Sequence, residues 1–446
     1  MSAGLSAVPR VPGGLPLLGH AVSLWRGPYE FVKSLRRHGD LVRVDLGTMP
    51  VYFVNSGQLA HEVMVTKGRS FEKGRFFDRL RPLVGDGLST ADSVTHRRHR
   101  RLMQPMFHRA RIAGYGEIMS EQARAMTESW TSGQTVAVDE AVGDFVVGTL
   151  ARTMFSGDIG RPAEEAVRRN VPIIIENLLL RTVSPKFLDR LPIGPNRRFD
   201  AAKLELHQVL DSVIASSRAS GDINGPDLLS LLLAARDADT GEALSDVEVR
   251  DELGTILFAG AETAASTLAW AFFEIARHPE VEEQVVAEVE SVVGDRPVTF
   301  EDVPKLEYLR RVIDEVVRLH SVTLLMRRAI EPVEIGGVSL PANTEIAFSL
   351  YALHQDPRWF PDPQRFDPDR WLAERSGDIP REAFAPFGSG TRKCIGDAFA
   401  WTEIPILLAT VLAQWRLRPE PGHVPSEAIA AMPHPDRLPM VVERRV

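Results

Sequence analysis

Hydrophobic positions recur at helical spacing over most of the chain. Between about residues 57 and 320, apolar side chains return every three or four positions, which is the period of an amphipathic α-helix. Clusters of Gly, Pro and Asp, such as 156–162 and 220–227, divide this region into segments of helix length. The pattern predicts a mainly α protein.

Alternation of apolar and polar positions, the period of a strand, is confined to a small β region at 41–55 and 331–353. In the first stretch we expect two strands joined by a turn at Thr48–Pro50. In the second, turns at Gly336–Gly337 and Pro341–Asn343 separate short strands.

The remaining segments fit around these elements. Residues 1–40 include a Pro/Gly-rich stretch and predict an extended N-terminal segment. The prolines and aromatic residues of 354–371 predict ordered coil, because proline interrupts both helices and central strands. Residues 398–415 predict an apolar helix. Because no linker divides the chain, we expect 1–446 to form a single domain.

The longest helical candidate, 245–279, starts with a capping box of Ser245 and Glu248 and ends at Pro279. About 33 residues rising about 1.5 Å each would span about 50 Å, so the middle of this helix should be buried. That middle instead reads AGAETAAST. Gly260 weakens a helix, and Glu262 places a carboxylate where apolar residues are expected.

Two interpretations of this helix centre stay open from the residues alone. Small residues could let the helix pack closely on another helix, with Glu262 on a wet face. Alternatively, Ala259 and Gly260 leave room for a flat cofactor and a diatomic ligand. In that case Thr263 bends the helix by bonding back to a carbonyl one turn earlier, and Glu262 with Thr263 forms an acid–alcohol pair that relays protons.

Composition narrows the functional class. The chain has 446 residues, of which 44% are hydrophobic and 25% charged, as in globular proteins. Its formal net charge of -8 argues against nucleic acid as the main partner. A single cysteine excludes an intramolecular disulfide. Because neither a signal peptide nor a run of roughly 20 apolar residues stands out, we expect a cytoplasmic protein without a membrane anchor.

The only cysteine, Cys394, lies in the stretch FAPFGSGTRKCIGDAF over 384–399. Taken alone, a single cysteine is most simply a small buried hydrophobe. Its surroundings favour another interpretation, because the glycines allow a tight turn and Arg392 places a positive charge that favours the thiolate. One thiolate cannot build a zinc cage or an iron–sulfur site, but it can be the axial ligand of a haem iron.

A haem carries two propionates, and three places in the chain offer donors for them. His96 and Arg100 lie four residues apart on one face of a predicted helix. Arg327 and Arg328 end an apolar run, and Arg392 lies two residues before the cysteine. From the residues alone, the basic segment around His96 could equally be a solvated face.

Glu315 and Arg318 lie one helical turn apart among apolar residues. Such a pair is usually a surface ion pair of small energetic value. If it is buried, it needs further partners, and Arg365 in the proline-rich stretch is a candidate third member.

These motifs, in this order, resemble those of the cytochrome P450 monooxygenases. The haem-loop signature F-x-x-G-x-R-x-C-x-G is matched by Phe387, Gly390, Arg392, Cys394 and Gly396. The oxygen-activation motif is matched by Ala259, Gly260, Glu262 and Thr263, and the E-x-x-R motif by Glu315 and Arg318. The resemblance covers most of the chain and implies the cytochrome P450 fold, a mainly α single haem-binding domain with a small β region.

The resemblance also implies a role for each matched residue. Cys394 would be the axial thiolate of haem b, and this ligand favours O–O cleavage. Glu262 and Thr263 would steer protons to dioxygen, and Glu315, Arg318 and Arg365 would be structural. The propionates would be held by His96, Arg100, Arg327 and Arg392, and the other cofactor contacts would come from Ala259, Gly260, Phe387 and Gly396.

Two departures from the family pattern matter. His96 stands where family members often carry Trp. Leu319, His320, Ser321 and Val322 replace the usual Leu-x-Pro-Pro, which leaves open whether Arg327 or Arg328 faces a propionate. Counting back from the turn at 334–337 favours Arg327.

The expected partners follow from the soluble bacterial members of the family, which take electrons from a ferredoxin through a separate ferredoxin reductase. A monomer in the cytoplasm is expected. Segments expected over the distal haem face supply Phe76, Phe77, Ile174, Leu178, Leu324 and Met432. These side chains predict a mainly apolar substrate.

The overall pattern is similar to bacterial sesquiterpene oxygenases such as pentalenene oxygenase, which indicates a terpenoid of secondary metabolism. Fatty acids, polyketides and steroids remain alternative substrates. A haem-thiolate gas sensor, and an isomerase or peroxide-driven enzyme, are alternatives in function. The Glu262–Thr263 pair counts against both, because neither needs it. A nucleic-acid protein using the basic residues 95–101 is disfavoured by the negative net charge.

Overall fold

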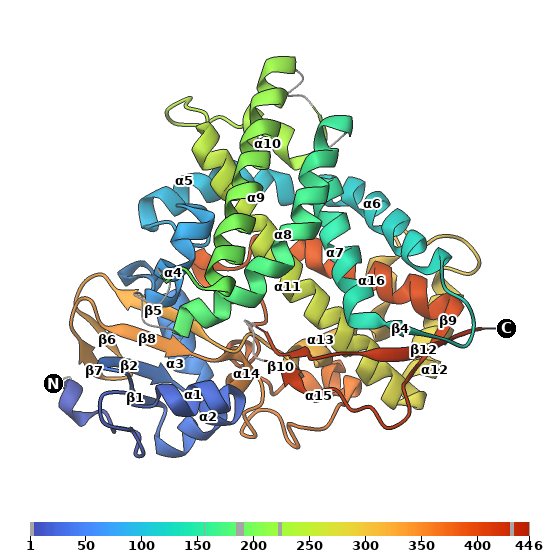
Figure 1. Ribbon diagram of the computed structural model, residues 1–446. Coiled ribbons are helices and arrows are strands. Elements are labelled where there is room, and N and C mark those ends of the chain that lie inside the picture. Colours follow the sequence, from blue (N-terminus) through green and yellow to red (C-terminus); the bar gives the residue numbers. More distant parts are fainter. Residues whose placement is uncertain (1–3, 156, 184–190, 222–224, 429–431, 446) are drawn as a thin grey trace.

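The structure is a computed structural model that describes residues 4–155, 157–183, 191–221, 225–428 and 432–445. The chain is mainly helical with small sheets, as the hydrophobic pattern predicts (Figure 1). The α-helices are α1 (Ala21–Arg26), α2 (Pro28–Ser34), α3 (Gly57–His61), α4 (Arg75–Val84), α5 (Ser93–Met103), α6 (Arg109–Glu128), α7 (Val138–Met154), α8 (Gly157–Val183), α9 (Gly194–Ser220), α10 (Leu228–Ala234), α11 (Asp246–Arg277), α12 (Pro279–Val292), α13 (Glu307–Leu319), α14 (Leu350–Leu353), α15 (Ala373–Ser376) and α16 (Asp397–Gln414).

The strands form sheets at the edges of the helical body. They are β1 (Leu41–Leu46), β2 (Met49–Val54), β3 (Phe71–Lys73), β4 (Gln134–Ala137), β5 (Leu325–Ala329), β6 (Val333–Ile335), β7 (Val338–Leu340), β8 (Glu345–Phe348), β9 (Trp415–Pro419), β10 (Glu427–Ala428), β11 (His434–Pro435) and β12 (Pro439–Arg444). The largest sheet has the order β1-β2-β8-β5-β3, and a second has the order β4-β12-β9. Strands β3, β4, β5, β9, β10, β11 and β12 lie outside the two stretches in which alternation predicts strands.

The first hairpin turns earlier than expected. Leu46 pairs with Met49, so the turn consists of Gly47 and Thr48, and Pro50 lies in the strand rather than in the turn. Gly47 has a φ of 63°, a conformation that glycine adopts at no steric cost. Proline is tolerated at this position because pairing with β8 begins only at Val51.

The expectation of an extended segment over residues 1–40 is wrong for its second half. Helices α1 and α2 occupy much of 21–34, and a 3-10 turn follows at Leu35–His38. Pro28 stands at the first position of α2, where the missing N–H of proline is not needed. Tyr29 and Val32 are buried against the large sheet, which supplies the packing that the local sequence pattern did not reveal.

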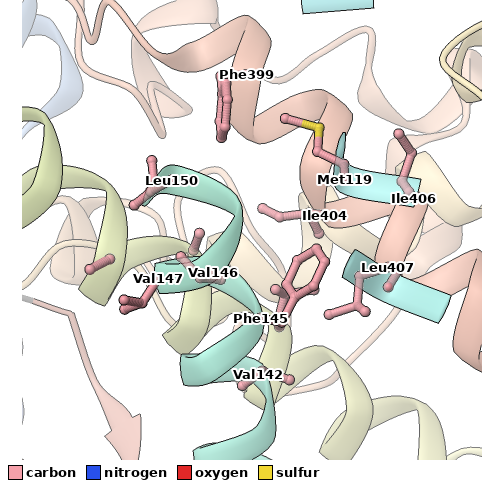
Figure 2. Packing of buried hydrophobic residues seen from close by; sticks show 14 of the residues in the cluster. Met119, Val142, Phe145, Val146, Val147, Leu150, Phe399, Ile404, Ile406 and Leu407 are labelled. Carbon is pink, nitrogen blue, oxygen red and sulfur yellow. The ribbon is translucent and has the colours of Figure 1, made fainter. Parts of the chain in front are cut away.

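Helix α16, which begins three residues after Cys394, is anchored in the main hydrophobic core. Figure 2 shows Phe145 of α7 opposite Ile404 and Leu407 of α16. Leu407 is completely buried, and full burial of such a side chain contributes about 1.5–3 kcal/mol. The core therefore fixes the backbone that carries the cysteine.

Helix α11 crosses the centre of the molecule. Ser245 caps it, and Ser245 and Glu248 form the predicted capping box. It is the one helix of the described residues that is long and apolar enough to span a membrane, contrary to the expectation that no stretch would be. Because 61% of its apolar window is buried inside the protein, its composition is that of a core helix.

Candidate cofactor site

The loop before α16 holds Cys394 in a fixed geometry. The Cys394 backbone N–H donates to the Phe387 carbonyl over 2.9 Å. The Phe387 ring meets the Trp401 ring edge-on at 5.2 Å. Gly390 has a φ of 71°, and a Cβ there would lie 2.0 Å from the Met64 carbonyl oxygen. Only glycine fits at residue 390, so the loop lies directly on the chain around Met64.

The Cys394 side chain has accessible surface, yet the surrounding protein desolvates its sulfur, and this raises the pKa of the thiol. The Gly396 amide and the cations Arg100 and Lys73 act in the opposite direction. The expectation that Arg392 favours the thiolate stays a prediction. Arg392 donates from Nη1 to the carbonyl of Ala91 over 3.0 Å.

Four cationic side chains, Lys73, Arg100, Arg327 and Arg392, form what we term the cation cluster. Arg327 of β5 is 6% exposed, and burial with the nearby charge of Arg392 lowers its pKa to about 10. Lys73 pairs with Arg327 across the β3–β5 ladder. Burial, followed by the charges of Arg327 and Arg392, lowers the pKa of Lys73 well below its usual value.

His96 of α5 lies beside the cluster and is 5% exposed. Burial, then the charges of Arg392 and Lys73, lowers its pKa to about 3. The imidazole is therefore neutral at physiological pH and can offer one N–H to an acceptor. Arg100, one turn further along α5, donates to the Lys393 carbonyl beside the cysteine.

The cation cluster fits an anionic cofactor. In the part of the chain that the structure describes, none of its members forms a salt bridge with a carboxylate. Arg392 Nη2 is buried without a hydrogen-bond partner. Arg327 is buried, and the other three cations are half-buried. Such cations without a carboxylate in salt-bridge contact are costly, and the two carboxylates of a haem would compensate them. The donor set therefore fits haem b.

Arg328 differs sharply from Arg327. It forms salt bridges with Glu345 at 2.7 Å and Asp78 at 2.6 Å, and a longer one with Glu72 at 3.4 Å. These carboxylates already neutralise Arg328. The structure thus places Arg327, and not Arg328, in the cation cluster.

The centre of α11 combines both interpretations of its small residues. Ala259 is exposed although most of the helix around it is buried. Thr263 Oγ1 donates to the Ala259 carbonyl over 2.8 Å, as predicted, and the helix nevertheless runs without a break. A Cβ at Gly260 would lie 3.0 Å from Leu150 of α7. Gly260 therefore allows close packing on α7, and the expectation that it also makes room for a cofactor stays a prediction.

Glu315 and Arg318 of α13 form a completely buried pair, with Arg318 Nη2 2.8 Å from Glu315 Oε1. Arg365, the expected third member, is exposed and contributes only its carbonyl oxygen to Arg318. The second guanidinium at Glu315 belongs to Arg370, at 3.3 Å, and Trp371 donates to the same carboxylate over 3.0 Å. The third member is thus Arg370, and the expectation that it would be Arg365 is wrong.

The apolar side chains expected over the distal face separate into two groups. Phe76 and Leu324 are half-buried, whereas Phe77 and Met432 are 8% and 5% exposed. Ile174 is completely buried in the main hydrophobic core, so it is not available to line a pocket. The side chain of Leu178 lies outside the described residues.

The comparison with known families decides the identity of the chain. The family model named cytochrome P450 matches residues 9–436. The chain belongs to the cytochrome P450 family. This P450 is a monooxygenase, and its family implies a haem-thiolate cofactor, dioxygen and redox partners.

Similar curated proteins include oxygenases of Streptomyces. This P450 is 42% identical to cyclooctat-9-en-7-ol 5-monooxygenase of Streptomyces melanosporofaciens, over 97% of this chain and 95% of the relative. It is 37% identical to pentalenene oxygenase of Streptomyces avermitilis, over 96% of this chain and 95% of the relative. Among solved structures, the cytochrome P450DA heme domain matches with a TM-score of 0.85 and 26% identity, over 98% of each chain.

Proposed function

We propose that this P450 binds haem b through Cys394 and inserts one oxygen atom from O2 into a mainly apolar terpenoid. The observation that carries the proposal is the cation cluster. Its buried positive charge lacks carboxylate partners among the described residues, and two of its members, Arg100 and Lys73, act on the Cys394 sulfur. A cofactor with one thiolate-ligated iron and two carboxylates satisfies both features.

Within this proposal the propionates are held by charge and by a histidine donor. Arg327, Arg392, Arg100 and Lys73 supply the positive charge. His96 donates a ring N–H. Lys73 was not found from the sequence, since only the pairing of β3 with β5 brings it beside Arg327.

When bound, a haem with a thiolate ligand supplies the oxygen-activating chemistry. The residues of α11 would manage protons around it. The Thr263 hydroxyl donates to the Ala259 carbonyl, so its oxygen can still accept a hydrogen bond from a donor on the cofactor side. Glu262, one residue before, would carry protons to that hydroxyl.

The relatives support a terpenoid substrate. The name of the relative from Streptomyces melanosporofaciens describes an alcohol with a ring alkene, and pentalenene, in the name of the other relative, is a hydrocarbon. Phe76, Phe77 and Leu324 offer such a molecule apolar contacts. A polycyclic terpenoid of secondary metabolism is therefore proposed ahead of a fatty acid, polyketide or steroid. Ferredoxin and ferredoxin reductase in the cytoplasm are the proposed electron donors.

The first test is the spectrum of the reduced protein under carbon monoxide. The strongly red-shifted Soret band of thiolate-ligated haem is expected, and Cys394→Ser should abolish it. Arg101→Gln is the control, since Arg101 of α5 is exposed and its ion pairs are with Asp237 and Asp239. A Soret band typical of histidine ligation in the undenatured wild-type protein would refute the proposal. If the thiolate band is observed, the next step is to screen terpenes for displacement of the water on the distal side.

A further inference from the structure

The loop between α4 and α5, residues 85–92, is attached to α11 by backbone hydrogen bonds to two acidic side chains. The Asp86 N–H donates to Asp251 Oδ2 over 3.0 Å, and the Leu88 N–H donates to Glu252 Oε2 over 3.1 Å. Glu252 is completely buried. The position of this loop thus depends on a carboxylate inside the helical body.

Glu252 is held in turn by a histidine of α5. His99 is 1% exposed, its Nδ1 lies 2.6 Å from Glu252 Oε1, and its Nε2 lies 3.2 Å from Glu248 Oε1. Both ring nitrogens face carboxylates, so both must carry a proton for both contacts to be hydrogen bonds. The arrangement Glu252–His99–Glu248 is therefore a buried imidazolium between two carboxylates.

The loop also fits closely against α11 through two glycines. A Cβ at Gly85 would lie 1.8 Å from Asp251 Oδ2, and a Cβ at Gly87 would lie 2.2 Å from Thr255 Oγ1 and 2.7 Å from the Asp251 carbonyl. Contacts below 3.0 Å are not tolerated without movement. A side chain at Gly87 must lift the loop from the helix, because the Asp251 backbone cannot rotate away.

The position of the loop connects it with the candidate cofactor site. Thr255, under Gly87, precedes Ala259 by one helical turn. At the other end of the loop, the Ala91 carbonyl accepts the hydrogen bond from Arg392 of the cation cluster. The loop therefore bridges the α11 face that carries Ala259 and Thr263 to the cations of the cofactor site.

We propose that Glu252, His99 and Glu248 form a buried ionic latch that fixes the loop 85–92 on α11, and that this latch determines how firmly a ligand is held over the distal face. His99 and Glu252 are positioning residues, since they act through the loop. The effect of the latch on ligand binding rests on the proposed function. The attachment of the loop to α11 does not, and it can be measured without a cofactor or ligand.

Hydrogen–deuterium exchange of the purified full-length protein tests the latch directly, because the amides of Asp86 and Leu88 are its bonded donors. His99→Gln and Glu252→Gln each leave a buried charge without its partner, so peptides covering 85–92 should exchange about tenfold faster or more. Peptides from the β1–β2 hairpin should not change. Arg101→Gln on the same helix should leave both regions unchanged.

Two further variants separate a latch from simple loss of packing. The double variant of His99→Gln and Glu252→Gln removes both charges and keeps hydrogen-bonding groups, so it should exchange more slowly than either single variant. Gly87→Ala changes no charge but should release the same loop. The latch would be overturned if exchange accelerated equally in the hairpin and loop peptides, or if the effects of the two single variants added up in the double variant. Unchanged exchange of the loop in Gly87→Ala would also overturn it.

The link to ligand binding uses 4-phenylimidazole, an apolar azole whose binding to haem shifts the Soret band. The single latch variants and Gly87→Ala should weaken its binding about fivefold or more, because an ordered loop no longer covers it. Unchanged affinity together with faster loop exchange would overturn the link to the ligand. Absence of the red-shifted Soret band under carbon monoxide would instead refute the proposed function, and the exchange result for the loop would remain valid.

Discussion

Arg327 and Arg328 are neighbours in the chain with opposite surroundings. Successive side chains of a strand point to opposite faces, so β5 sends Arg327 into the cation cluster and Arg328 to Glu345, Asp78 and Glu72. The sequence motif left the choice between them open. The strand register decides which arginine joins the cation cluster. It thereby also decides which arginine lacks a counter-charge.

Replacing each arginine should therefore give a different defect. Arg327→Gln should lower the haem content of the purified protein and change its melting temperature little, because a buried unpaired charge is removed. Arg328→Gln should instead lower the free energy of unfolding by about 2 kcal/mol, since several carboxylates lose their partner. Haem-to-protein ratios and urea unfolding distinguish the two, and identical defects would contradict the assignment.

Thr263 is the other residue with a separable role. Thr263→Ala should keep the thiolate spectrum but lower product formation relative to electron consumption, with peroxide released, because proton delivery is lost. A loss of about 10²-fold or more is the scale for such a group. The measurement is the ratio of product to reduced nicotinamide consumed, and Thr263→Ser, which keeps the hydroxyl, should restore it. Full coupling in the alanine variant would remove the relay role.

Much of the site could be predicted at this scale because its chemistry lies in short motifs. Cys394, Arg392 and Thr263 are spaced within single loops or turns, where local sequence determines which groups meet. The sequence analysis missed Lys73 and Arg370, because only the tertiary structure places them beside their partners. Lys73 reaches the cluster only through the β3–β5 pairing, and Arg370 reaches Glu315 only after the proline-rich segment folds back.

At the scale of elements, α11 contacts four other parts of the chain along its length. Its first turns carry the acidic side chains that hold the loop 85–92 and α5. Its centre presents Ala259 and packs Gly260 on α7. Near its end, Ser266 and Trp270 both donate to the Pro433 carbonyl. Most of these contacts join residues far apart in sequence, so periodicity predicted the helix but not its attachments.

The contact between α5 and α11 should make stability depend on pH. His99 faces Glu248 and Glu252 of α11, with Asp251 beyond them, and has Arg98 and His96 near it on α5. Hydrogen bonds to the two glutamates raise the pKa of His99 against the effect of burial. The stabilisation is thus complete below about pH 6.5, the pKa of a free histidine, and is lost as the pH rises through the higher pKa of the folded state.

The measurement is the difference in melting temperature between wild type and His99→Gln across this range. The difference should be largest on the acid side and shrink as the medium becomes alkaline. Burial also raises the pKa of Glu252, so the stability of the wild-type protein itself should fall as this acid ionises. A difference that grew with pH would contradict the charged state assigned to His99.

At the scale of the whole molecule, Glu315 joins α13 to the coil around 354–371. It accepts from Arg318, Arg370, Trp371 and the Asp367 amide. Glu315→Gln leaves two buried guanidinium groups without their counter-charge and should cost about 3–5 kcal/mol. Denaturant unfolding of the holoprotein measures this. Arg365→Gln is the matched control and should be close to wild type, since only the backbone of Arg365 takes part.

The sequence patterns predicted the mainly α class and the position of the long helix, because these depend on local periodicity. They did not predict the sheet β4-β12-β9. Its strands are short, and β4 has no buried side chain to mark it. Such strands exist because distant segments supply their partners, which no local window contains.

The pairing of β12 with both β4 and β9 has a consequence for biosynthesis. Pro439 stands opposite Ala137, so β4 must wait for about 300 further residues to leave the ribosome before its partner exists. Closing such a distant contact slows folding. During that interval the edge of α7 and β4 is uncovered, and chaperone binding to nascent chains should concentrate there.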